Sequence, residues 1–192
     1  MDTHTFFGYA SGVISCLAFI RYYWTIVRGE SKPNLATWLI WSIVGFIIWR
    51  TYGEVGAKET IWLALTYFVL PTITLLMILS KGRFKFKDLD YICLGIAAIS
   101  LVIWQGMRNP LGALITCLIA DLAAATATMR TTWREPLETL KEDKFAWVLA
   151  VLASFVNLFA IEDWSHWQLT IQPVYYVTFN FIIMLPLYTR KK

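Results

Sequence analysis

The stretch from Arg21 to Trp49, RYYWTIVRGESKPNLATWLIWSIVGFIIW, carries the plan of the whole chain. An apolar run ends there on an aromatic, basic segment, a short polar turn follows, and a second apolar run opens just after Pro33. Proline suits the first turn of a helix, where its missing N–H is not needed. The stretch therefore predicts two helices joined by a short turn.

A weaker copy of this stretch begins 109 residues further on, at Arg130. The residues with an identical partner at that offset include Ala18, Arg21, Trp24, Lys32, Trp38, Phe46 and Tyr67. The same offset also aligns apolar run with apolar run and loop with loop. The pattern predicts two copies of one three-helix unit.

The composition is typical of a polytopic membrane protein. Hydrophobic residues make up 58% of the chain and charged residues 16%, and the mean hydropathy is +0.56. Soluble domains carry about 45–50% apolar and about 25% charged residues, and a run of about 20 apolar residues can cross a bilayer as a helix. We expect seven such helices, at about 5–27, 35–53, 60–80, 89–107, 110–130, 145–162 and 172–189.

The lysine and arginine residues predict an orientation. With the N-terminus outside, 13 of the 17 basic residues fall in cytoplasmic segments, and Arg50, Lys58 and Arg108 fall in outer ones. The positive-inside rule then places the C-terminus in the cytoplasm. The short loops favour a prokaryotic plasma membrane, and the cytoplasmic loops account for the net charge of +4 without a nucleic-acid partner.

The repeat and the orientation together predict the fold class. We expect an all-α integral membrane protein with seven transmembrane helices, arranged as two parallel three-helix bundles joined by an inverter helix. The first repeat covers residues 1–83, the inverter helix 84–108 and the second repeat 109–192. Parallel repeats are one architecture of transporters, whose substrate site lies between the repeats near the midplane of the bilayer.

Two short motifs resemble the SWEET / PQ-loop superfamily. The string WRTYG at 49–53 resembles the W-x-x-Y-G that closes the second helix of sugar-transporting SWEETs, and the turn RGESKPN at 28–34 is similar to the basic turn of PQ-loop proteins. The resemblance spans nearly the whole chain. It implies a transporter that moves a small polar solute, a sugar or similar, by alternating access. The Pro-Gln pair that names the PQ-loop is absent, and Leu70-Pro71 replaces the Pro-Asn of sugar SWEETs.

Asp121 is the sharpest anomaly in the chain, because it lies in the apolar run LITCLIADLAAATA at 114–127. Eleven residues of helix place it about 16 Å deep, where a carboxylate costs roughly 2.5–3.5 kcal/mol. It is a candidate substrate contact or proton-coupling site, and the alternative is a carboxylate hydrogen-bonded for packing. Asn180 lies about 12 Å into the last expected helix, and Tyr176 is one turn away on the same face.

The resemblance assigns Asn180 to the substrate-binding asparagine in the middle of the SWEET seventh helix. Tyr67, the partner of Tyr176 in the other repeat, completes the predicted central site. Asn157 is a further candidate contact, for which packing between helices is the favoured interpretation. The resemblance also makes Trp49 a candidate pocket wall or outer gate, although a tryptophan at the membrane interface needs no ligand.

Arg21 and Arg130 are paired by the repeat and are candidates for an inner gate. Arg21 can also extend to the inner interface without any such role. Helix packing explains the Gly8 and Gly12 pair in the first helix, because small residues let helices approach closely.

The sequence indicates no enzyme, cofactor or metal site, since it holds no phosphate-binding glycine loop, no metal-ligand spacing and no catalytic triad. The expected partners are the lipid bilayer and a small polar solute, with a homo-oligomer left open. Three alternatives remain. One is a receptor without transport, as in the KDEL receptor, which this plan also resembles. The others are a membrane assembly subunit and a vitamin carrier of the PnuC type.

Overall fold

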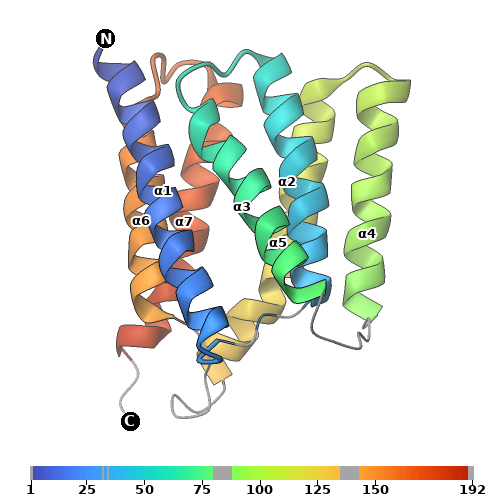
Figure 1. The fold of residues 1–192 in the computed structure, drawn as a ribbon. Helices are drawn as coiled ribbons and strands as arrows, with labels where there is room; N and C mark the ends of the chain where they lie inside the picture. Colours follow the sequence, from blue (N-terminus) through green and yellow to red (C-terminus); the bar gives the residue numbers. More distant parts are fainter. Residues whose placement is uncertain (1, 32, 34, 80–87, 135–142, 190–192) are drawn as a thin grey trace.

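The computed structural model describes residues 2–31, 33, 35–79, 88–134 and 143–189, and within them every regular element is a helix (Figure 1). The helices are α1 (Thr3–Val27), α2 (Leu35–Val55), α3 (Ile61–Leu79), α4 (Asp88–Leu101), the short π-helix η1 (Val102–Gly106), α5 (Pro110–Arg134), α6 (Lys144–Leu158) and α7 (Trp167–Thr189). The start of α1 and the end of α7 lie at opposite ends of the bundle (Figure 1).

Each of the seven expected ranges contains an α-helix, but three boundaries differ by four or five residues. The last helix begins five residues earlier than expected, at Trp167, because Pro173 does not end it. The fifth continues to Arg134, and the sixth ends at Leu158 rather than near 162. Lys32 and Asn34, which the sequence places at the first turn, lie outside the described residues.

Three of the described helices are long and apolar enough to cross a membrane: Thr3–Val27, Ile61–Leu79 and Trp167–Thr189. The outer face of α1 is apolar, since Val13, Leu17 and Ile20 are all more than half exposed. Its inner face buries Ser11 and Ser15 completely. An apolar outside around a polar inside is compatible with a lipid environment.

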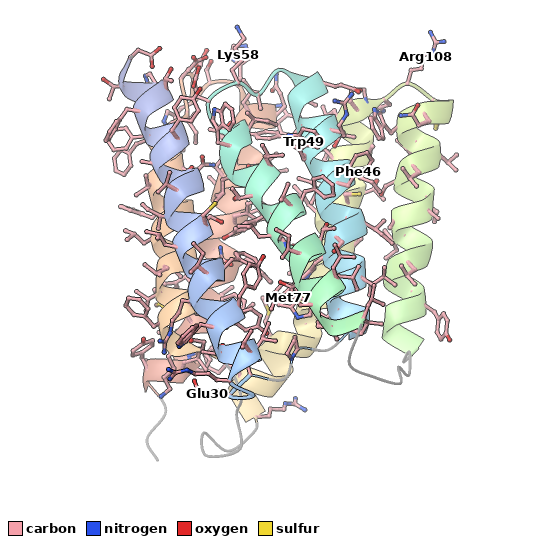
Figure 2. All side chains as sticks on the ribbon, viewed as in Figure 1. Glu30, Phe46, Trp49, Lys58, Met77 and Arg108 are labelled. Atoms are coloured by element: carbon pink, nitrogen blue, oxygen red, sulfur yellow. The ribbon has the colours of Figure 1, made fainter. Side chains whose placement is uncertain are left out.

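Charged side chains lie at the two ends of the bundle. Figure 2 shows Lys58 and Arg108 at the end where α1 begins and Glu30 at the opposite end. Charge gathered at the ends of a helical bundle is compatible with a bilayer.

The helices pack in a pattern that repeats itself. Helix α3 packs between α1 and α2, and α7 packs between α5 and α6. Helix α1 also packs on α6, and α2 on α5. The contacts of α1, α2 and α3 therefore have counterparts among those of α5, α6 and α7. The α1–α3 pair corresponds to α5–α7, the α2–α3 pair to α6–α7, and the α1–α6 pair to α2–α5. Helix α4 has no counterpart in this correspondence and lies at one edge, against α5 and α2 (Figure 1).

Glycines allow close approach at two of these crossings. A Cβ atom added at Gly8 would collide with the backbone oxygen of Glu59, just before α3. A Cβ atom added at Gly45 of α2 would lie 2.5 Å from the Tyr67 carbonyl oxygen. Both α1 and α2 therefore approach the segment around α3 at backbone distance, as the glycine pair in the first helix predicts for α1.

Proline residues inside α7 lack the N–H group that would bond to the carbonyl four residues earlier. Side chains of other helices donate to those carbonyl groups instead. Pro173 cannot donate to the carbonyl of Leu169, and the Tyr52 hydroxyl donates to that oxygen at 2.6 Å. In the same way, Trp133 Nε1 donates at 3.2 Å to the carbonyl of Ile182, four residues before Pro186. The tyrosine of the W-x-x-Y-G string thus joins α2 to α7.

Candidate functional site

Asn180 is the centre of a hydrogen-bonded cluster that joins three helices. Its amide nitrogen donates to the Tyr67 hydroxyl of α3 at 2.8 Å and to the Ser154 hydroxyl of α6 at 2.7 Å. Asn180 is 3% exposed, and among the described residues no donor reaches its carbonyl oxygen Oδ1. Both hydrogen bonds use the amide nitrogen, so Oδ1 remains available to accept a hydrogen bond.

Tyr67 and Tyr176 meet, as the predicted central site requires. Their ring centroids are 4.7 Å apart, with the planes at 52°. These are the two tyrosines related by the offset of 109 residues. Residues related by a two-fold axis can touch each other only where they lie on that axis, so this contact marks the centre of the repeat pattern.

Asp121 lies close to this cluster, but its partner is Tyr175 rather than Tyr176. The Tyr175 hydroxyl donates to Asp121 Oδ2 at 2.6 Å, which joins α7 to α5. Adjacent residues of a helix point about 100° apart. Tyr176 and Asn180 accordingly face α3 and α6, whereas Tyr175 faces α5.

The depths of the two candidate residues agree. Asp121 lies eleven residues into α5, about 16 Å from its start. Because α7 begins at Trp167, Asn180 is thirteen residues into it, about 20 Å from its start rather than the expected 12 Å. Both side chains lie in the middle third of the bundle.

The helix sets α1–α3 and α5–α7 share a packing pattern but carry different chemistry. At the offset of 109, Asp121 and Tyr175 correspond to Gly12 and Thr66. Gly12 and Thr66 also face each other, since a Cβ atom added at Gly12 would lie 3.8 Å from the Thr66 methyl group. The hydrogen-bonded carboxylate therefore occurs on one side of the pattern only, which makes the centre of the bundle asymmetric.

Two buried polar side chains near the site have no hydrogen-bond partner among the described residues. Gln172, one turn before Tyr176 on α7, is fully buried; its amide makes no hydrogen bond of good geometry and has the Tyr176 hydroxyl as a polar neighbour. Trp41 of α2 has a buried Nε1 without an acceptor. An unpaired buried polar group costs about 1–3 kcal/mol, so these two groups are the most readily available for a polar ligand.

Sequence reasoning missed Ser154, Tyr175 and Gln172. A serine in an apolar run is common, and neither Tyr175 nor Gln172 stands out among its neighbours. The signal for Gln172 is its spacing, because Gln172, Tyr176 and Asn180 follow one another at four-residue intervals along one face of α7.

Asn157 and Trp49 lie apart from the contacts of Asn180. Asn157 is fully buried, accepts from Ser11 at 3.0 Å and donates to the Thr60 carbonyl at 3.4 Å. It joins α6 to α1 and to the segment before α3. Trp49 stacks on Phe68 of α3, with ring centroids 5.7 Å apart. No described contact joins Trp49 to Asn180 or Asp121.

Arg21 of α1 forms an ion pair with Asp143, the residue before α6. Its Nε lies 2.9 Å from Asp143 Oδ2, and the Asp143 side chain is 4% exposed. Asp143 also accepts from the backbone N–H groups of Phe145 and Ala146, at 2.9 and 3.0 Å, and so caps the start of α6. The side chain of Arg130, the other predicted gate residue, lies outside the described residues.

The site offers one carboxylate, an amide oxygen, three phenol groups and an unpaired amide. The described residues contain no group of three or more His, Cys, Asp or Glu side chains that could hold a metal ion. These groups can bind a small polar molecule through hydrogen bonds and aromatic contacts. Comparisons of the chain with models of protein families, with curated proteins and with solved structures found no match.

Proposed function

We propose that this chain is an integral membrane transporter of the SWEET / PQ-loop type, which moves a small polar solute by alternating access. The solute would bind in the middle of the bundle, at Asn180, Tyr67, Tyr176 and Asp121. The observation that carries the proposal is the Asn180 cluster: a buried amide that joins α3, α6 and α7 and keeps its carbonyl oxygen Oδ1 unpaired among the described residues.

Location in a bilayer is supported by the apolar helices and by the exposed apolar face of α1. The side chains of Asn180 and Asp121 are costly to place in hydrocarbon. Each therefore needs a hydrogen-bond partner, water or a bound ligand. Ionisable residues inside membrane spans usually mark a substrate or ion pathway. Their position in the interior, rather than toward lipid, agrees with that role.

The division into two repeats is supported by the exchangeable packing of α1, α2 and α3 with α5, α6 and α7. It is also supported by the contact between Tyr67 and Tyr176. In this proposal the two three-helix units rock against each other about the central tyrosines. The site would then open to each face of the membrane in turn.

The ion pair between Arg21 and Asp143 has a place in this mechanism. It joins the last turns of α1 to the first residue before α6, and so ties one repeat to the other at the cytoplasmic end of the proposed orientation. Opening toward the cytoplasm would break it. Because the Arg21 side chain is 46% exposed, the pair is worth about 0–1 kcal/mol, weak enough to break in each cycle.

The test is uptake into proteoliposomes of a panel of sugars, nucleosides, vitamins, amino acids and amines. We expect at least one solute to be taken up by the wild type, and Asn180→Ala to lose at least about tenfold of that rate. Thr178→Ala is the matched control, since Thr178 is exposed and its hydroxyl bonds only to the Val174 carbonyl of its own helix. Uptake unchanged in Asn180→Ala would refute the proposed site.

Two other results would replace the proposal. A solute that raises the thermal stability of the protein but crosses no membrane would indicate a receptor. Absence of both binding and uptake across the panel would indicate an assembly subunit. A ligand present at a hundred times its dissociation constant adds about 2.7 kcal/mol to the stability, which a thermal-shift measurement detects.

A further inference from the structure

We propose that the transported solute is an organic cation, a protonated amine or a quaternary ammonium, whose charge is held by Asp121 and the aromatic rings beside it. This inference rests on the proposed function and names the substrate class of the same site. The argument uses the charge balance around Asp121, its hydrogen bonds and the rings that surround it.

Asp121 is the carboxyl group of the described site, and no described cation pairs with it. The basic side chains that form described ion pairs lie elsewhere, and Arg21 is bound to Asp143. Within one helical turn of Asp121, α5 carries no basic residue.

Among the described residues, one of the two carboxylate oxygens of Asp121 accepts a hydrogen bond. Tyr175 donates to Oδ2 at 2.6 Å, and among the described residues no donor reaches Oδ1. Asp121 is 9% exposed, so it is less completely sealed than Gln172 or Asn157, which are both fully buried. A buried carboxylate with one free oxygen requires a further positive partner or a proton.

Aromatic rings gather around Tyr175, the hydrogen-bond partner of Asp121. Tyr175 stacks on Phe179, with ring centroids 5.7 Å apart and planes at 12°, and lies 5.5 Å from the ring of Tyr176. Trp41 packs against the same cluster as Tyr175, around Phe179. The faces of such rings attract a cation, and tryptophan does so most strongly.

This combination favours an organic cation over the other small solutes. An anion would be repelled by the carboxylate, whereas an organic cation supplies the positive partner that its free oxygen lacks. Calcium takes six to eight oxygen ligands, whereas the described site offers one carboxylate among rings. Carboxylate plus aromatic faces is the chemistry that recognises ammonium groups.

The test uses pairs of probes that differ in charge but not in shape. Choline is compared with its neutral carbon analogue 3,3-dimethylbutan-1-ol, and glucosamine with glucose. Binding is measured by thermal shift on the purified full chain, and uptake is measured in proteoliposomes. We expect the cation of at least one pair to bind at least about tenfold more tightly than its neutral analogue.

Asp121→Asn should abolish that preference, and Asp163→Asn is the matched control. Asp163 is exposed in the segment before α7, where hydrogen bonds from Ser165 lower the pKa of its carboxyl group. The same loss in both variants would mean nonspecific attraction of cations and would overturn the inference. If Asp121→Asn does not fold, the two probe pairs on the wild type still decide the result.

The outcomes separate this inference from the proposed function. Neutral probes that bind as tightly as the cations, or are taken up in preference to them, would overturn the cation proposal and leave the transporter proposal standing. Uptake of no solute in the wider panel, charged or neutral, would overturn both.

Discussion

The hydrogen bond between Asn180 and Ser154 gives the sharpest test of the central cluster. The Asn180 amide nitrogen makes two short bonds, at 2.7 Å to Ser154 and 2.8 Å to Tyr67. Hydrogen bonds between membrane helices are worth about 0.6 kcal/mol on average and up to about 1.7. Asn180→Ala should therefore lower the free energy of unfolding by about 1–3 kcal/mol.

A double-mutant cycle isolates one of these bonds. Ser154→Ala combined with Asn180→Ala should show a coupling energy of about 0.6–1.7 kcal/mol, measured by equilibrium unfolding in mixed micelles and followed by tryptophan fluorescence. The coupling is expected because each single variant removes the same bond. Thr178→Ala combined with Asn180→Ala should be additive, since the Thr178 hydroxyl bonds within α7.

The reasoning would be refuted by additive effects of Asn180→Ala and Ser154→Ala, within about 0.3–0.5 kcal/mol. The amide would then not bridge α7 and α6, and its assignment to the centre of the site would lose its main support. A coupling as small as that of the Thr178 control would have the same meaning.

Three further changes test other parts of the structure. Gln172→Leu should leave the thermal stability unchanged or raise it, because it removes an unpaired buried amide worth about 1–3 kcal/mol, yet it should reduce solute uptake. Gly45→Ala should destabilise the chain by about 1–3 kcal/mol, since its Cβ would press on the Tyr67 carbonyl. Asp143→Ala should cost about 1–3 kcal/mol by removing the cap of α6 and the ion pair with Arg21.

Each of these changes has its own control. A clear loss of stability in Gln172→Leu would mean that the amide is paired in the folded protein. Gly95→Ala serves beside Gly45→Ala, because nothing lies within 4 Å of a Cβ at Gly95; equal effects would exclude the close approach of α2 and α3. Arg21→Gln removes the ion pair but keeps the cap, so it should cost about 1 kcal/mol or less. A loss equal to that of Asp143→Ala would contradict the capping role.

The helical class and the approximate position of each helix could be predicted from the sequence. Length, apolar runs and turn residues are local properties, and they locate a helix without knowledge of its neighbours. The errors lie at the ends. Trp167 starts α7 five residues early, because Tyr52 supplies the hydrogen bond that Pro173 cannot make. That compensation comes from a distant helix and leaves no mark near Trp167.

The candidate site was predicted in part. Tyr67, Tyr176 and Asn180 lie together, as expected from the repeat and from helical spacing. Trp49 does not join their contacts, since it stacks on Phe68 instead. Depth along a helix follows from counting residues, but the direction of a side chain around the helix depends on which neighbours pack there.

The sequence by itself determined that the chain forms apolar helices, that two stretches repeat at 109 residues, and that Asp121 and Asn180 lie deep within apolar runs. These properties depend on composition and spacing along the chain. Only the tertiary structure decided that Tyr175 donates to Asp121 and that Arg21 pairs with Asp143. Neighbouring residues of a helix point about 100° apart, so those partners depend on how helices far apart in sequence are rotated against one another.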